Sequence, residues 1–116
     1  MTNKEYRAKV ATMDVYSSRD YLKGTDIKEL RADAKRRVEN GNETYLSGFR
    51  ATTRTESRGL VLRSYNTDVA YFDHDGKFHK TWDDYSATTL KHVNLFRENK
   101  GLAPLNKREW VEMEMY

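Results

Sequence analysis

Residues 59–100 decide the fold of this chain; they read GLVLRSYNTDVAYFDHDGKFHKTW and then DDYSATTLKHVNLFRENK. β-Branched, aromatic and leucine residues gather there in three short segments, at 60–65, 69–72 and 78–82, and such segments are typical of strands. Asp75-Gly76 favours a hairpin turn before the third segment, although a two-residue and a four-residue loop would place Phe78 opposite different partners. The stretch therefore predicts antiparallel strands.

The second part of this stretch predicts a helix over residues 86–99. Ser86 stands at the N-cap position, where its hydroxyl is expected to accept a hydrogen bond from the backbone N–H of Thr88 or Thr89. One stripe of the helix carries Thr89, Val93 and Phe96, flanked by Leu90. The opposite stripe carries Thr88, His92, Leu95 and Asn99.

Two further elements are predicted on the N-terminal side. Apolar residues fall on one helical face in 26–40, where Asp26 and Glu29 have the spacing of a capping box and Asn40-Gly41 is a stop signal. Residues 44–55 are rich in Thr, Tyr and Phe and predict a single strand.

The two ends of the chain leave alternatives open. Residues 1–24 fit a helix or an extended segment, with the helix favoured. After Pro104, Asn106 and Glu109 have the spacing of a capping box for a short helix that carries Trp110. The alternation of Val111, Met113 and Met115 would also suit a strand.

Length and composition favour one small domain. The chain has 116 residues, 37% hydrophobic and 34% charged, with a net charge of +3. This mild charge falls short of the basic excess that is typical of dedicated nucleic-acid binders. The absence of Cys excludes disulfides, thiolate zinc sites and cysteine nucleophiles, and is compatible with a reducing cytoplasm. No apolar run has membrane-spanning length, so we expect no membrane association and a cytoplasmic location.

These elements predict an α+β fold: a three- or four-stranded antiparallel sheet with the helices 26–40 and 86–99 packed on one side. We expect a single domain, 1–116. It consists of an N-terminal segment, 1–24, an α-β-β-β-α core, 25–100, and a C-terminal extension, 101–116.

The central block resembles a family of small bacteriophage and mobile-element proteins. Its pattern is Ser-Tyr-x-Thr-x-Val-Ala, a turn glycine, and then Tyr-Ser-x-Thr-Thr-x-x-His-x-Asn-x-Phe. The matching residues here are Ser64, Tyr65, Thr67, Val69, Ala70, Gly76, Tyr85, Ser86, Thr88, Thr89, His92, Asn94 and Phe96. The resemblance implies a phage or mobile-element origin and assigns no catalytic residue.

The start of the helix 86–99 is a candidate anion site. A helix N-terminus attracts anions through its free N–H groups, and hydroxyls and an imidazole surround this one. The candidate residues for phosphate or carboxylate binding are Ser86, Thr88, Thr89 and His92. The competing interpretation is a structural cap with Thr89 turned into the core, which by itself explains Ser86.

Four arginines on adjacent predicted strands are candidates for nucleic-acid binding: Arg50, Arg54, Arg58 and Arg63. They alternate with aromatic residues, so they are expected to converge on one sheet face. The order helix, three strands, helix also resembles a double-stranded-RNA-binding domain, but residues 87–91 lack the lysine cluster of that family. The competing interpretation is a half-buried sheet with arginines on its wet face.

No residue pattern predicts catalysis or a metal. Asp73, His74, Asp75 and His79 offer metal ligands near a hairpin, but their spacing matches no metal motif, and the Asp-Gly turn has a conformational reason. The chain has no nucleophile-elbow glycines and no Gly-rich phosphate loop. We therefore expect a non-enzyme without a metal or cofactor.

These observations favour a non-catalytic accessory protein that binds a host macromolecule. A host defence nuclease is the expected partner, inhibited in the manner of an anti-CRISPR or anti-restriction protein. Tyr71, Trp82 and Tyr85, beside the hairpin, are the candidate contact residues, because rigid aromatic side chains dominate interface energetics. Nucleic-acid binding and anion binding at Ser86 are the alternatives.

Overall fold

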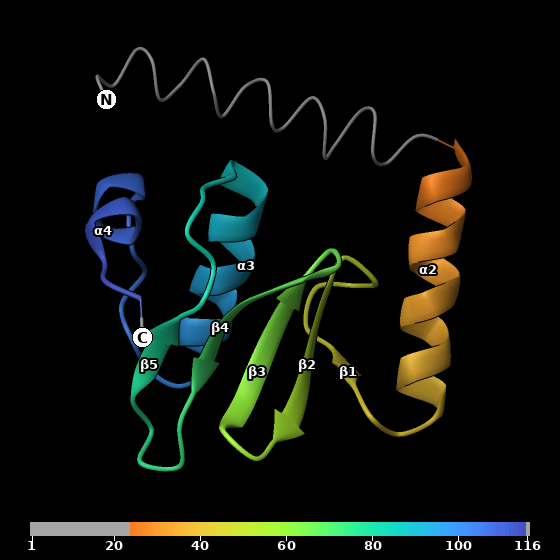
Figure 1. The fold of residues 1–116 in the computed structure, drawn as a ribbon, viewed down its shortest axis with the longest axis horizontal. Coiled ribbons are helices and arrows are strands. Elements are labelled where there is room, and N and C mark those ends of the chain that lie inside the picture. Colours follow the sequence, from red (N-terminus) through yellow and green to blue (C-terminus); the bar gives the residue numbers. More distant parts are fainter. Residues whose placement is uncertain (1–23, 116) are drawn as a thin grey trace.

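The computed structural model describes residues 24–115 and has the α+β class that the sequence predicts (Figure 1). Three helices and five strands follow one another in it. In chain order they are α2 (Gly24–Glu39), β1 (Thr44–Tyr45), β2 (Ala51–Glu56), β3 (Gly59–Ser64), β4 (Thr67–Phe72), β5 (Phe78–Lys80), α3 (Ala87–Glu98) and α4 (Lys107–Glu112).

The sheet has five strands in the order β1-β2-β3-β4-β5, and every neighbouring pair is antiparallel. The prediction of three or four strands was wrong because residues 44–55 are not one strand. The chain turns back at Gly48, whose φ is 59°, and the Leu46 N–H donates to the Ala51 carbonyl at 2.8 Å. A glycine tolerates this left-handed conformation, and thus the turn separates β1 from β2.

Two of the hairpins depend on unusual backbone. Gly59, after the β2–β3 turn, has a φ of 132°, and a Cβ there would lie 1.9 Å from the Phe72 carbonyl oxygen. Only glycine therefore fits where β3 passes β4. The β3–β4 hairpin places Tyr65 at a φ of 56°, which is uncommon for a bulky residue, and a bulge at Val69 shifts its register.

The loop between β4 and β5 settles the register that the sequence left open. Phe72 pairs with Phe78 across a five-residue loop, and their rings meet edge to face with centroids 5.5 Å apart. The two predicted loop lengths were thus both too short. The Asp73 carboxylate closes the loop by accepting from the N–H groups of Asp75 and Lys77.

The sheet has two chemically different faces. The register places most apolar residues of β3, β4 and β5 on the face against which α3 packs, where the core contains Leu62, Ala70, Phe72, Val93 and Phe96. The other face, which we call the ionic face, carries Thr52, Arg54, Glu56, Val61, Arg63, Asp68, Tyr71 and His79.

Helix α3 begins as predicted. Ser86 is its N-cap, and the Ser86 Oγ accepts from the Thr89 N–H at 3.2 Å. The buried stripe differs from the predicted one, because it includes His92 together with Thr89, Val93 and Phe96. These positions have the i, i+3, i+4, i+7 spacing of one helical face, so His92 lies inside rather than on the opposite stripe.

Helix α2 does not share the position of α3, contrary to the predicted pair of helices on one face. It lies beside the β1 end of the sheet (Figure 1). Its contacts with the rest of the chain include Arg31 over the Phe49 ring and Arg37 bonded to Glu43, while Leu30 and Ala34 are buried. The predictions for residues 1–23 and for the Asp26 side chain lie outside the part that the structure describes.

In the C-terminal part the structure has the short helix and not the alternative strand through Val111, Met113 and Met115, because Val111 lies in the helix. The capping box of Asn106 and Glu109 is present and begins α4, whose Trp110 is buried in the core. Met115 then forms a parallel bridge with Lys80 of β5. The buried Lys80 ammonium donates to the carbonyls of Trp110 and Met113, at 2.8 and 3.2 Å. Among the helices of residues 24–115, none is long and apolar enough to cross a membrane.

Candidate functional site

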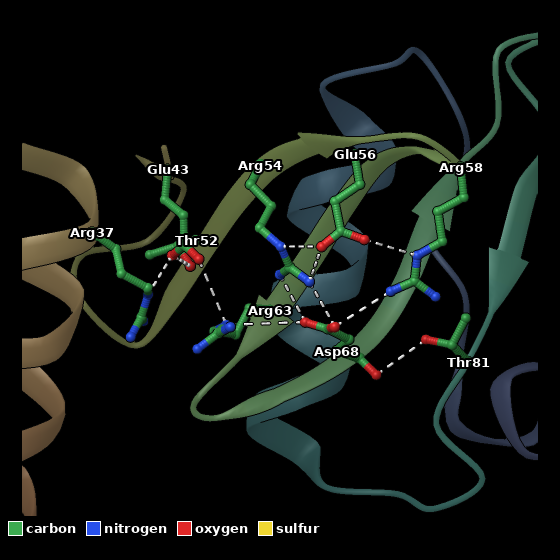
Figure 2. Close-up of polar contacts among 9 residues, drawn as sticks. All are labelled: Arg37, Glu43, Thr52, Arg54, Glu56, Arg58, Arg63, Asp68 and Thr81. Atoms are coloured by element: carbon green, nitrogen blue, oxygen red, sulfur yellow. Dashed lines mark hydrogen bonds and ion pairs between the residues drawn. The ribbon is translucent and has the colours of Figure 1, made fainter. Parts of the chain in front are cut away.

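A chain of ion pairs crosses the ionic face and joins β2, β3 and β4 (Figure 2). Asp68 is its centre. Its carboxylate accepts two parallel hydrogen bonds from Arg54, at 2.8 and 2.7 Å, and a third from Arg58 at 3.3 Å. Arg54 also donates to Glu56 at 2.6 Å. Forked contacts of this kind fix both side chains in one geometry.

The network continues to α2 through Glu43. The Glu43 Oε2 accepts from Arg37 at 2.8 Å and from the Thr52 hydroxyl at 2.7 Å. Arg63 lies between the two halves, with its Nε 3.7 Å from Glu43 Oε1 and 3.9 Å from Asp68 Oδ1. The Glu43 side chain is only 2% exposed, so it is a buried carboxylate held between two guanidinium groups.

The surrounding arginines keep both central carboxylates ionised. Burial tends to raise the pKa of Glu43, but the hydrogen bonds from Arg37 and Thr52 and the charges of Arg37 and Arg63 outweigh it, and the pKa is lowered. The hydrogen bond from Arg54 lowers the pKa of Asp68. Two donors of the network still have no acceptor: Arg37 Nη2 and Arg63 Nε are buried and make no hydrogen bond.

An aromatic arm extends the network toward the β4–β5 hairpin. The Arg58 guanidinium lies 5.2 Å from the centre of the Tyr71 ring, which stacks on His79 with a centroid distance of 4.5 Å. His79 Nε2 in turn lies 2.7 Å from Asp73 Oδ2. The ionic face thus carries a continuous row of oriented charged and aromatic side chains from α2 to β5.

The structure brings together three of the four predicted nucleic-acid-binding arginines. Arg54, Arg58 and Arg63 belong to the network, and each is close to a carboxylate. Arg50 is separate: it precedes β2, lies 4.4 Å from the Phe49 ring centre, and is near enough to His92 to lower the pKa of that imidazole. Arg50 was predicted to share the sheet face because arginines and aromatic residues alternate in the sequence. That alternation ends at the turn before β2.

The acidic half of this network and the contribution of α2 were not predicted from the sequence. The missed residues are Arg37, Glu43, Glu56 and Asp68. Glu56 was detectable, because it follows Arg54 by two positions and so shares its face of the strand. Asp68 was hidden, since the bulge at Val69 shifts the alternation of β4 by one residue.

The residues of the predicted anion site form a buried polar cluster instead of an open one. The Ser64 Oγ lies 3.0 Å from Thr89 Oγ1 and 2.8 Å from His92 Nδ1. Ser64, Ser86, Thr89 and His92 are all buried, whereas Thr88 is half-buried. Burial, together with the charge of Arg50, lowers the pKa of His92 to about 4, so the imidazole is neutral at pH 7.

The three aromatic residues predicted to bind a partner lie apart. Tyr71 is on the ionic face. Trp82 and Tyr85 are partly buried and pack against the core. Tyr85 also lies beneath the Lys107 ammonium, which is 5.1 Å from its ring centre.

The hairpin residues considered as metal ligands are engaged with one another and with the backbone. Asp73 holds His79, and His74 Nε2 lies 2.7 Å from the Ser57 carbonyl oxygen. Within residues 24–115 no group of three or more His, Asp or Glu side chains is arranged to hold a metal ion.

Comparison with known proteins gives one match. A model described as a family of unknown function, DUF8033, matches residues 21–112. No curated protein and no solved structure matches the chain.

Proposed function

We propose that this chain, which belongs to the DUF8033 family of unknown function, is a non-catalytic protein that binds a macromolecule of the host cell through its ionic face. The ordered row of arginines, carboxylates and aromatic rings on that face is the observation that carries the proposal. We assign it to the cytoplasm of the host. The resemblance of its central block to small phage proteins supports the narrower role of an accessory protein that inhibits a host defence nuclease.

The burial of Ser64 and His92, which are hydrogen bonded to each other, supports the proposed lack of catalysis. A nucleophilic serine must reach its substrate, and its histidine must accept and return a proton. Here Ser64 is 2% exposed and also contacts Thr89, while His92 is 5% exposed. A substrate carbonyl could approach this serine only if the core opened.

A protein is the favoured partner because most charges of the ionic face are already ion-paired. Arginine and tyrosine are common hot-spot residues, and side chains held in one geometry lose little entropy on binding. Arg58 and Tyr71 fit this description, since the Arg58 side chain is 38% exposed and Tyr71 is half-buried. Of the three predicted contact aromatics, Tyr71 is the one on this face.

Nucleic-acid binding by the same face is the second candidate function. It is favoured by the convergence of Arg54, Arg58 and Arg63 on neighbouring strands. Against it, phosphates would have to compete with Asp68 and Glu56 for these guanidinium groups. Binding of this kind weakens steeply with salt because each phosphate contact releases counterions.

A titration against purified defence nucleases of the host tests the primary proposal. Because an inhibitor without chemistry acts by occupying a surface, nuclease activity should fall to zero near one equivalent when the complex is tight. Inhibition at far less than one equivalent would contradict a binding role and indicate an enzyme.

Alanine variants on and off the ionic face show whether this face binds the nuclease. Arg58→Ala and Tyr71→Ala should weaken inhibition. Arg36→Ala should not, although Arg36 is also an exposed, ion-paired arginine. Equal inhibition by all three folded variants would show that the partner binds another surface. A salt-sensitive gel shift with the wild-type chain would favour nucleic acid as the partner.

A further inference from the structure

The ion-pair network of the ionic face has more positive than negative groups. Its guanidinium groups are those of Arg37, Arg54, Arg58 and Arg63, and its carboxylates are those of Glu43, Glu56 and Asp68. These seven groups are four positive and three negative, so one positive charge is in surplus among them; Asp73, at the far end of the aromatic arm, is engaged by His79. A surplus charge in a partly buried place is costly unless an anion compensates it.

The surplus lies at the end of the network formed by Arg37 and Arg63. Arg54 and Arg58 bind Asp68 at hydrogen-bonding distance. Arg63, by contrast, is 3.7 Å or more from both of its carboxylate neighbours. Arg63 Nε and Arg37 Nη2 are also the only buried guanidinium nitrogens without a hydrogen bond in residues 24–115. The surplus of positive charge and the unmade hydrogen bonds therefore lie at the same end of the network.

We propose that Arg37 and Arg63 form a binding site for a single oxyanion, a carboxylate or a phosphate group. The two guanidinium groups come from α2 and β3, and both are neighbours of the Glu43 carboxylate (Figure 2). Glu43 orients both of them, through Oε2 for Arg37 and Oε1 for Arg63. This site does not depend on the proposed function, since free phosphate, a metabolite or an acidic group of a partner would be recognised by the same chemistry.

Guanidinium chemistry selects the ligand class. Each planar guanidinium presents a fork of N–H donors that matches two oxygens of a carboxylate or phosphate, and charge-assisted hydrogen bonds of this kind are short and strong. A monoanion would neutralise the surplus charge and supply acceptors to the unpaired donors. The start of α3 lacks this property, because the Thr89 and His92 side chains already hydrogen bond to Ser64, and the Ser86 hydroxyl accepts from the Thr89 backbone N–H.

Arginine Nε–Hε signals in two-dimensional NMR report directly on the site. Inorganic phosphate and acetate are titrated separately into the full chain, with sodium chloride at matched ionic strength as the reference. We expect saturable shifts of the Arg37 and Arg63 signals with at least one oxyanion and none with chloride. The oxyanion with the lower dissociation constant shows whether the site prefers a phosphate or a carboxylate group.

Variants separate binding at this site from nonspecific attraction. Arg37→Gln should weaken oxyanion binding about tenfold or more, as expected for loss of a charged hydrogen bond. Arg63→Lys, which keeps the charge but removes the fork, should also weaken it. Arg36→Gln, on the exposed side of the same helix, should bind like the wild type. Linear shifts that match those with chloride overturn the proposal, and so does a folded Arg37→Gln variant with wild-type affinity. The wild-type titration decides by itself if a variant does not fold.

Discussion

His92 illustrates how one buried side chain couples the stability of this protein to pH. It is 5% exposed, hydrogen bonds to Ser64, and lies with its ring centre 5.8 Å from that of Tyr65. Protonation would place a charge in this cluster beside Arg50. The imidazole therefore contributes stability only while it is neutral.

We predict that the free energy of unfolding falls as the pH drops from about 6.5 toward 4. An unfolded chain protonates histidine near its ordinary pKa of about 6.5. The folded chain resists protonation down to a pKa of about 4. The unfolded state thus binds more protons between these values, and the loss amounts to roughly 3 kcal/mol. Urea melts at several pH values measure it. His92→Gln should flatten this dependence, and His74→Gln controls for the loss of an exposed imidazole; an unchanged slope in His92→Gln would contradict the assignment.

A second prediction at the residue scale concerns the cap of α3. Ser86→Ala removes the acceptor for the Thr89 N–H and should lower stability by about 0.5 to 2 kcal/mol without preventing folding. Thr88→Ala is the matched control, because Thr88 is half-buried and no cap depends on its hydroxyl. Thermal melts compare the two, and equal melting temperatures would contradict a stabilising cap.

Among the elements, α4 depends on contacts with residues elsewhere in the chain. Six residues form too short a helix to be stable in isolation. Trp110 anchors it in the core, and its indole N–H donates to the Asp84 carbonyl at 2.8 Å. Asn94 of α3 binds the segment before α4 twice, since its amide donates to the Leu105 carbonyl and accepts from the Leu105 N–H.

We therefore predict that Asn94→Ala loosens the C-terminal segment while leaving the sheet intact. Loss of two hydrogen bonds should cost about 1 to 3 kcal/mol. Hydrogen exchange should be faster at Leu105 and in α4 than in the wild type, with β3 and β4 unchanged. Asn99→Ala, at the exposed end of the same helix, is the control. Wild-type exchange at Leu105 in the Asn94 variant would show that other contacts hold this segment.

At the scale of the whole molecule, the ion-pair network connects α2 to the sheet. Arg37 reaches from α2 to Glu43, and Arg63 connects Glu43 with Asp68 of β4. Exposed ion pairs contribute little to stability, but removing one partner of a buried pair leaves an uncompensated charge. Position within the network should therefore decide the effect of each substitution.

We predict a large cost for Glu43→Gln and a small cost for Glu56→Gln. The Glu43 side chain is 2% exposed and faces two arginines, so its neutralisation should cost about 3 to 5 kcal/mol. Glu56 is 36% exposed, and its loss should cost about 1 kcal/mol or less. Urea melts measure both. Similar costs for the two variants would contradict the buried character of the Glu43 pair.

Acid should act on this network below the range in which His92 titrates. The pKa values of Glu43 and Asp68 are lowered in the folded state, so the unfolded chain binds more protons as the pH falls below about 4.5. The stability that these two carboxylates contribute is complete above that pH and decreases as the pH falls toward their lowered pKa values. In His92→Gln this second, more acidic loss should remain; its absence would contradict the network's contribution.

The sequence by itself determined the elements whose signals are local. The cap at Ser86, the capping box of Asn106 and Glu109, and the strands and helix of residues 59–100 depend on short spacings and on backbone preferences. These features need no distant partner. The α+β class follows from their order along the chain.

Only the tertiary structure decided how these elements meet and which side chains share a site. The turn at Gly48 split one predicted strand into two, and the bulge at Val69 moved Asp68 onto the face of the arginines. Packing also turned His92 inward to Ser64, 28 residues away. The bulge and the position of His92 depend on contacts between residues far apart in the sequence, and the free energy of such contacts is absent from any local window. For that reason Arg54, Arg58 and Arg63 were predicted from the sequence, whereas the carboxylates of Glu43 and Asp68 that lie beside them were not.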